Sequence, residues 1–215
     1  MDALYANAVL TAQSKNKLDA GKIRRMLAAD GFTSAAAVLP ECGYDISKPD
    51  DIVINELKKS VDLFCELCPD GAVCDCILIP YTYHNARVLY KARLGLIDAK
   101  PALYPFGTAN EMKEVYKTLD AAKDLTANTI DGAFDAAMTA EMTKTAAKIT
   151  DKNIRKYFLS GGAGVLKNSA DFFSLEMLLK WFISKRAELK KVKIILMGKK
   201  LGLNRDKIRE LLNER

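Results

Sequence analysis

The stretch SLEMLLKWFISKRAELKKVKIILMGKKLGLNRDKIRELL, Ser174–Leu212, decides the fold class. Its apolar positions recur three or four residues apart, at Leu175, Leu178, Leu179, Phe182, Leu189, Val192 and Leu196. This spacing places them on one face of an α-helix, because about 3.6 residues complete a turn. Ser174 can cap the start of this helix, and Gly198 is expected to end it. Asn204 can cap a last, shorter helix that runs to Asn213.

Helical spacing continues through the rest of the chain. Six prolines and twelve glycines interrupt it, and alternating apolar and polar runs are nearly absent, so no sheet is predicted. Thr108 and Glu111 have the spacing of a capping box. Besides the two helices above, we expect helices at about residues 3–16, 19–29, 34–39, 50–68, 72–94, 108–124, 127–148 and 151–159.

The predicted fold class is therefore all-α, with multi-helix lobes built from antiparallel helical hairpins in a funnel-like or elongated bundle. Short matches among YANAVL (Tyr5–Leu10), YTYHNARVL (Tyr81–Leu89) and ITDKNIRKYF (Ile149–Phe158) hint that the lobes are related by repetition. We expect an N-terminal helical lobe, residues 1–107, and a C-terminal lobe, residues 108–215, that holds the long helix and a basic terminal hairpin.

Composition and charge narrow the class of protein. The 215 residues are 49% hydrophobic and 28% charged, which is typical of a globular chain and excludes a disordered one. The net charge is +6, but Lys185–Arg215 holds 11 basic and 4 acidic residues, a net of +7, so the remainder sums to −1. A basic end indicates an acidic partner, such as nucleic acid, anionic lipid or an acidic protein surface, or else a solvated helix face.

No targeting or spanning segment is predicted. No apolar run approaches the roughly 18 residues that span a bilayer. The start, MDALYANAVL, lacks the basic stretch followed by an apolar core that marks a secretory signal. We therefore expect a soluble cytoplasmic protein, which would contact a membrane only peripherally.

Four cysteines lie close together, at Cys65, Cys68, Cys74 and Cys76. Four thiolates at this spacing could bind zinc, and Cys65 with Cys68 could form a redox pair. However, three of the four fall on apolar faces of predicted helices, where reduced cysteine packs as a small hydrophobic residue. Core thiols are the preferred interpretation. With the isolated Cys42 and no secretory signal, the set fits a reducing compartment.

No catalytic constellation is found in the sequence. His84 is the only histidine, which excludes most acid–base and nucleophilic schemes built on imidazole. Asp131 and Asp135 are one helical turn apart, a pattern typical of a solvated surface. Gly161–Gly164, followed by Lys167, lacks the spacing of a phosphate-binding loop. We predict no enzyme, no metal and no cofactor.

The basic end also resembles a helix-turn-helix. In MGKKLGLNRDKIRELLNER, a Gly-Leu turn precedes a helix that offers Arg205, Lys207 and Arg209 to phosphates or base edges. A helical nucleic-acid-binding protein is therefore the alternative function.

Three segments, taken in order, share the features of one protein family. The first, YANAVLTAQSKNKLDAGKIRRMLAADGFTSAAAVLPECGYD, begins at Tyr5 and places Tyr44 near its end. The second, LIPYTYHNARVLYKARL, carries Tyr83, His84 and Asn85 in one helix. The third is Ser174–Leu212, where the matching positions are Lys185, Glu188, Leu189, Val192, Lys193, Ile195, Gly198, Lys199, Gly202, Leu203, Ile208 and Arg209.

These segments resemble the C-type subunit of bacterial and archaeal V-type/A-type ATP synthases, which is the counterpart of the d-type subunit of the vacuolar ATPase. Thr82 stands where the family usually has Asp, and Pro101–Leu159 is shorter than the family's middle by roughly one lobe. The resemblance implies a non-catalytic funnel of helical lobes, which joins the central stalk to the membrane rotor ring and transmits torque. It implies no small-molecule substrate and no cofactor.

Two sets of residues follow from the resemblance and the charge. The family-motif residues are expected to be structural: Tyr5, Tyr44, Tyr83, His84, Asn85, Glu188, Gly198 and Gly202. The cations of the basic end are candidates for binding acidic surfaces of the stalk or ring: Lys185, Lys193, Lys199, Lys200, Arg205 and Arg209.

Overall fold

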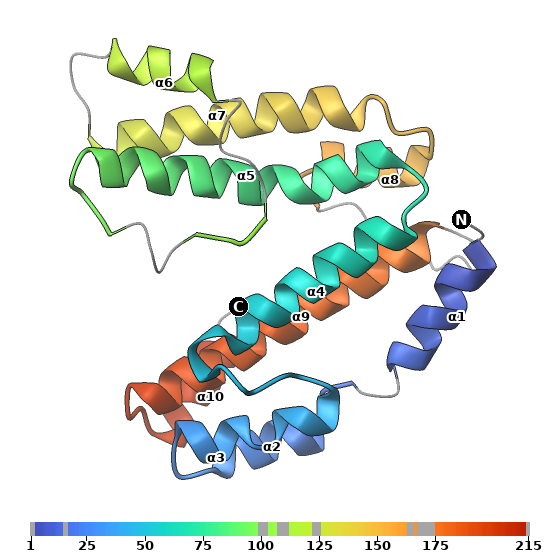
Figure 1. Cartoon of the computed structure of the whole chain (residues 1–215), viewed down its shortest axis with the longest axis vertical. Helices are drawn as coiled ribbons and strands as arrows, with labels where there is room; N and C mark the ends of the chain where they lie inside the picture. The colour runs from blue at the N-terminus through green and yellow to red at the C-terminus, as the bar shows by residue number, and fades with distance from the viewer. Residues whose placement is uncertain are drawn as a thin grey trace. The chain divides into compact units, whose positions relative to one another are not determined.

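The computed structural model describes residues 3–14, 17–98, 103–106, 112–121, 126–162, 166 and 175–213. Every regular element within these ranges is helical, and none of them contains a strand (Figure 1). The predicted all-α class is therefore confirmed. The predicted arrangement of repeat-related hairpins in a funnel stays a prediction.

The described helices follow the predicted order. They are α1 (Ala3–Ser14), α2 (Ala20–Ala28), α3 (Phe32–Ala36), α4 (Ile52–Leu67), α5 (Gly71–Arg93), α6 (Lys113–Asp120), α7 (Ala127–Ala146), α8 (Lys152–Leu159), α9 (Leu175–Lys200) and α10 (Arg205–Asn213), with 3-10 turns η1 (Leu39–Cys42) and η2 (Pro49–Asp51).

Side-chain caps explain where several helices begin. The Asp19 carboxylate accepts the backbone N–H of Lys22 at 2.8 Å at the start of α2. The Asn204 side chain accepts that of Lys207, also at 2.8 Å, at the start of α10. Each cap satisfies a donor that the first turn of a helix leaves unpaired. The caps predicted at Thr108 with Glu111 and at Ser174 lie outside the described residues.

The chain forms two compact units, and their boundary is not the predicted one. Unit 1 comprises Met1–Leu67 and Ser169–Arg215, and unit 2 comprises Cys68–Asn168. The predicted lobes, 1–107 and 108–215, differ from these units. The physical reason is that α9 packs against α1, α3 and α4, so both ends of the chain share one core.

Unit 1 is built around α9. The aromatic rings of Phe64 on α4 and Phe182 on α9 lie 5.1 Å apart, and both residues are fully buried. In Figure 1, α4 and α9 run alongside each other. The predicted apolar stripe of α9 is buried from Leu178 to Leu196, while Leu175 is half-buried.

Gly198 does not end α9, contrary to the sequence-based expectation. The helix continues to Lys200, and the backbone turns at Gly202, whose φ of +69° favours glycine. Gly198 is buried within the helix, where a Cβ would lie 2.6 Å from Cγ1 of Ile208 on α10. It therefore allows α9 and α10 to approach each other closely.

Unit 2 packs α5 against α7, with α6 beside them. Tyr83, Tyr90 and Phe134 belong to its buried core. At the edge of this core, Lys91 Nζ donates to Asp131 Oδ2 at 2.9 Å. Arg87 pairs with both Asp131 and Asp135. The acidic pair on α7, expected to be merely solvated, therefore forms ion pairs with α5.

Among the described helices, none is both long enough and apolar enough to span a bilayer.

Candidate functional site

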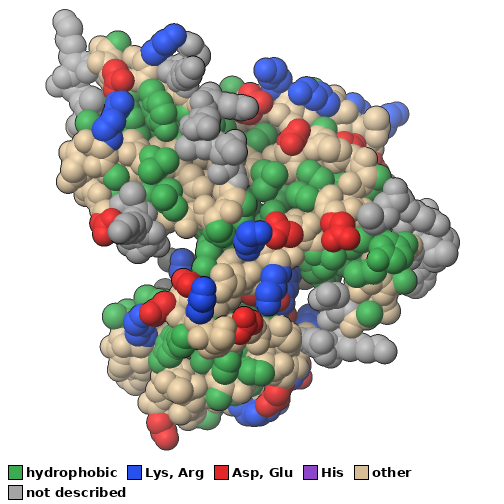
Figure 2. Space-filling model, in the orientation of Figure 1, with side chains coloured by type: hydrophobic (Ala, Val, Ile, Leu, Met, Phe, Trp, Pro, Cys, Tyr) green, Lys and Arg blue, Asp and Glu red, His purple; other side chains and the backbone are tan. Residues whose placement is uncertain are grey.

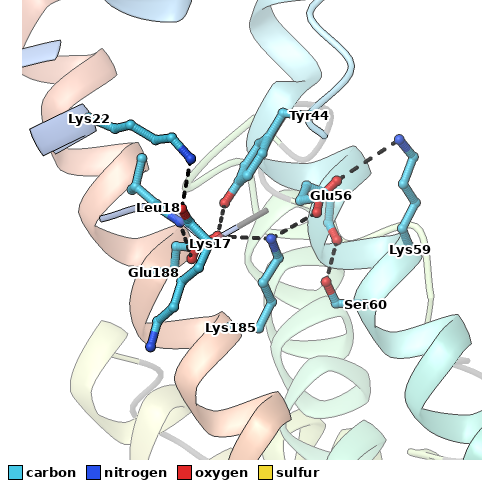
Figure 3. Close-up of polar contacts among 9 residues, drawn as sticks. All are labelled: Lys17, Leu18, Lys22, Tyr44, Glu56, Lys59, Ser60, Lys185 and Glu188. Carbon is cyan, nitrogen blue, oxygen red and sulfur yellow. Dashed lines mark hydrogen bonds and ion pairs between the residues drawn. The ribbon is translucent and has the colours of Figure 1, made fainter. Parts of the chain in front are cut away.

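Four residues from three segments of the sequence meet in unit 1 and form what we call the polar cluster: Tyr44, Glu56, Lys185 and Glu188 (Figure 3). Tyr44 follows η1, Glu56 lies on α4, and Lys185 and Glu188 are one turn apart on α9. The charged side chains are only 11–15% exposed, and Tyr44 is 3% exposed. Such burial of charge requires that each group be paired.

The hydrogen bonds of the cluster centre on Glu188. Its Oε1 accepts from the Tyr44 hydroxyl at 2.6 Å and from Lys185 Nζ at 2.8 Å. Its Oε2 accepts from the backbone N–H of Leu18 at 3.2 Å. Lys185 Nζ also lies 3.0 Å from Glu56 Oε1 and 4.4 Å from the centre of the Tyr44 ring. Each charge therefore has an opposite charge and at least one further polar or aromatic partner.

Local structure explains how these side chains come together. Gly43, with φ of +79°, lets the chain turn out of η1, so that Tyr44 can point toward α9. Lys185 and Glu188 lie on the same helix face, because residues three apart in an α-helix are neighbours. On α4, the Ser60 hydroxyl donates to the backbone oxygen of Glu56 at 2.7 Å. The cluster thereby joins the N-terminal segment to α4 and α9.

The contacts fix the charge states of the cluster. Burial alone would raise the pKa of Glu188, but hydrogen bonds from Lys185 and Tyr44 outweigh it and lower that pKa. Burial alone would lower the pKa of Lys185, yet Glu188 and Glu56 raise it overall. Burial, followed by the neighbouring carboxylate, raises the pKa of Tyr44. At neutral pH, Lys185 is therefore charged, Glu188 is ionised and Tyr44 is protonated.

A groove of about 620 Å³ runs beside the polar cluster. Its lining includes Val9 and Ala12 of α1, Trp181 of α9 and the three charged residues of the cluster. Nucleophilic or acid–base chemistry needs a group whose pKa lies near the working pH. Lys185 and Glu188 are instead stabilised in their charged forms by each other.

The family-motif residues of unit 1 have different environments. Tyr44 and Glu188 form the 2.6 Å hydrogen bond of the polar cluster. Gly198 and Gly202 shape the connection of α9 to α10. Tyr5 on α1 is 56% exposed, so the structure gives it no role in the core.

The family-motif residues of unit 2 hold a loop against α5. The Asn85 amide donates to the backbone oxygens of Tyr104 and Phe106 at 3.0 and 3.1 Å, and its Oδ1 accepts from Tyr104 N–H at 2.8 Å. The His84 ring meets that of Tyr104 edge-on, with centroids 4.9 Å apart. Tyr83 is buried in the core. All three residues therefore contribute to packing.

The candidate partner-binding cations divide into two groups. Lys185 belongs to the polar cluster, and Lys199 Nζ donates to the backbone oxygens of Leu27 and Ala29 at the end of α2. These two are engaged in contacts within unit 1, and their role in partner binding stays a prediction. The other four are exposed: Lys193, Lys200, Arg205 and Arg209. Two of these have acidic partners, since Lys200 lies 2.5 Å from Asp50 and Arg209 lies 3.6 Å from Asp206.

The five cysteines are free thiols in the structure. All five lie in the described ranges and none is in a disulfide. Among the described residues, no three His, Cys, Asp or Glu side chains are placed to hold a metal ion. Cys42 and Cys76 are buried, and burial raises the pKa of the Cys76 thiol to about 12. These two cysteines are core thiols, and the zinc alternative gains no support.

One residue of the polar cluster and one of its hydrogen-bond donors have no signal in the sequence. Glu56 is one acidic residue among mixed neighbours on α4, and nothing in its spacing distinguishes it from a solvated side chain. The backbone N–H of Leu18 is not encoded by any side-chain pattern. Only the contact of α4 and the N-terminal segment with α9 reveals both groups.

Comparison with known proteins adds no relative. No family model, curated protein or solved structure matches the chain. The arrangement of its own residues must therefore support any functional conclusion.

Proposed function

We propose that the chain is a non-catalytic adaptor subunit of a V/A-type rotary ATPase, linking the central stalk to the membrane ion-translocating ring at the cytoplasmic face. One observation supports this most directly. Residues from two motifs of the family resemblance, Tyr44 and Glu188, are 144 positions apart and are joined by a 2.6 Å hydrogen bond. Motifs that belong to one fold are expected to meet in this way, whereas unrelated chance matches are not.

The polar cluster also suits the proposed mechanical role. A subunit that transmits torque must resist deformation, and close-packed helices do so. The cluster joins the N-terminal segment, α4 and α9, while Lys199 joins the end of α2 to the same long helix. Other segments of unit 1 are thereby joined to α9 by polar contacts at two separate positions.

The proposal is tested by purifying the tagged chain from its native cells and identifying its partners by mass spectrometry. We expect central-stalk and membrane-ring subunits in amounts equal to the tagged chain. Untagged cells processed in parallel control for carry-over. Recovery of a folded, helical chain without any ATPase subunit would contradict the proposal.

Nucleic-acid binding through the terminal hairpin gains less support. On α10, Lys207 Nζ lies 2.7 Å from Glu210, and Arg209 lies 3.6 Å from Asp206. Two of the three cations offered to phosphates are thus partly neutralised by acids on the same helix. If nucleic acid were the partner, it would co-purify with the chain and dissociate steeply as salt rises.

A further inference from the structure

We propose that an exposed face of α9 docks an acidic amphipathic helix of a partner protein. This basic face consists of Lys190, Lys193 and Met197 on α9, with Leu201 just beyond its end. This inference deepens the proposed function. It rests on that function for one point alone, which is that the partner is a protein. The partner's chemistry follows from the charge, the exposure and the spacing of these four residues.

The four residues form one stripe. They are spaced by three, four and four positions, which keeps them on the same side of a helix. The opposite side of α9 is buried, including Val192, Ile195 and Leu196. The eleven steps from Lys190 to Leu201, at about 1.5 Å each, give the stripe a length of about 16 Å, or roughly three helical turns. A helix of similar length in the partner can lie along it.

The lysines of this stripe have no acidic partner in the part of the chain that the structure describes. From Leu189 to Arg205 the sequence has six basic residues and no acidic one. Among the described residues, neither Lys190 nor Lys193 has an ion-pair partner, whereas Lys58 pairs with Asp62 at 2.5 Å and Lys200 with Asp50 at 2.5 Å. Figure 2 shows basic and acidic side chains intermingled on the face that it draws. An acidic partner would complement the stripe.

The apolar end of the stripe indicates which kind of acidic partner fits. Met197 is 45% exposed and Leu201 is 70% exposed. A phosphate backbone offers nothing to bury these side chains against, while an amphipathic helix can place apolar residues there and carboxylates opposite the lysines. A lipid surface is disfavoured because an interfacial helix needs a broad exposed apolar face, and that face of α9 is buried in unit 1.

The test uses the full chain and a fluorescein-labelled synthetic helix. The probe is an amphipathic peptide of about 18 residues, five turns, with glutamates on one half of its binding stripe and leucines on the other. A scrambled peptide of the same composition is the control ligand. We measure affinity by fluorescence anisotropy at two salt concentrations. The chain should bind the probe at least about tenfold more tightly than the scrambled peptide.

Two double variants separate the two halves of the face. Lys190→Glu with Lys193→Glu should weaken binding at least about tenfold and reduce its salt dependence. Met197→Ser with Leu201→Ser should also weaken binding about tenfold, with the salt dependence kept. Lys152→Glu with Lys156→Glu, exposed on α8 of unit 2, carries the same charge change and should leave affinity unchanged. Circular dichroism verifies the fold of each variant.

Several outcomes would overturn the inference. The first is a loss of affinity in the α8 control as large as that in the Lys190 and Lys193 variant. The others are an unchanged affinity in the Met197 and Leu201 variant, and equal affinities for the probe and the scrambled peptide. Tighter binding at equal salt to duplex DNA, or to phosphatidylserine vesicles, would identify a different partner. If the chain binds the peptide but purifies from native cells without ATPase subunits, the docking face is supported and the proposed rotary ATPase function is rejected. If ATPase subunits are recovered but the peptide does not bind, only the docking face is rejected.

Discussion

At the residue scale, the hydrogen bond from Tyr44 to Glu188 makes a direct prediction. Tyr44→Phe removes a donor to a buried carboxylate and should lower the free energy of unfolding by about 1.5–3 kcal/mol. Urea denaturation followed by circular dichroism measures this loss. Tyr5→Phe is the matched control, because the Tyr5 side chain is exposed, and it should change stability by less than about 0.5 kcal/mol. Equal effects of the two changes would contradict the assigned role of Tyr44.

Glu188 predicts how stability depends on pH. Its pKa is lowered in the folded chain, so its contribution is present above the ordinary glutamate pKa of about 4.3 and is lost as pH falls through the folded pKa. Glu188→Gln should cost about 2 kcal/mol at pH 7, below the roughly 3–5 kcal/mol typical of a broken buried pair, because Glu56 still faces Lys185. The gap between wild type and variant should narrow as pH falls below the ordinary glutamate pKa and close below the lowered pKa of the folded chain.

At alkaline pH, Lys185 makes stability depend on pH in the opposite direction. Its pKa is raised, so its contribution is present below the ordinary lysine pKa of about 10.4 and is lost as pH rises through the folded value. Urea denaturation at several pH values measures both limbs. If the gap between wild type and Glu188→Gln were the same at pH 3 and pH 7, the assigned coupling would be wrong.

Two glycines in helices predict opposite effects of the same substitution. Gly198→Ala should destabilise by about 1–3 kcal/mol, because its Cβ would lie 2.6 Å from the buried, β-branched Ile208. Gly132→Ala, in the exposed middle of α7 with no atom within 4 Å, should stabilise by about 0.5–1 kcal/mol. Thermal denaturation compares the two. Stabilisation by both substitutions would show that Gly198 has no packing role.

At the element scale, Asn85 predicts which loop depends on α5. Asn85→Ala removes three hydrogen bonds to Tyr104 and Phe106 and should cost about 2–3 kcal/mol. Amide hydrogen exchange should accelerate at residues 103–106 more than within α5 itself. Leu89→Ala, on an exposed part of the same helix, is the control and should leave exchange at this loop unchanged. Unchanged exchange in Asn85→Ala would contradict the assignment.

Helix positions were predictable where a repeating side-chain pattern encodes them. The apolar stripe of α9 and the cap at Asn204 correctly predicted two helices. The roles of Gly198 and Gly202 could not be distinguished, because either glycine can end a helix and only the approach of Ile208 decides between them. The sequence located Tyr44 and Glu188 as motif residues, but not their contact or the participation of Glu56.

At the scale of the whole molecule, the division into units is the feature that local patterns missed. The predicted boundary at residue 107 lies between two predicted helices, whereas the packing of α4 against α9 joins segments more than 100 residues apart. Periodicity shows which face of a helix is buried but not which helix covers it. The long-range pairing that defines unit 1 is therefore visible only in the fold.

The division into two units predicts which helices exchange amide hydrogens faster after a local substitution. Glu188→Gln should accelerate amide hydrogen exchange in α2, α4 and α9, because the polar cluster connects segments of unit 1. Exchange in α5 and α7 should stay at the wild-type rate, since their core is separate. Mass spectrometry of peptic fragments resolves the two sets. Equal acceleration in both sets would mean that the two units open together.

The discontinuity of unit 1 has a consequence for how the protein is made. Residues 1–67 leave the ribosome well before α9 has been synthesised. The delay is roughly 5 to 20 s, because about 100 residues of unit 2 must be translated in between. Unit 2, continuous in sequence, can fold during that interval. Phe64 must meanwhile remain without Phe182 of α9, against which it later packs. Nascent chains stalled after residue 168 should therefore be bound by chaperones at α4, and chains extended through α9 should be released from them.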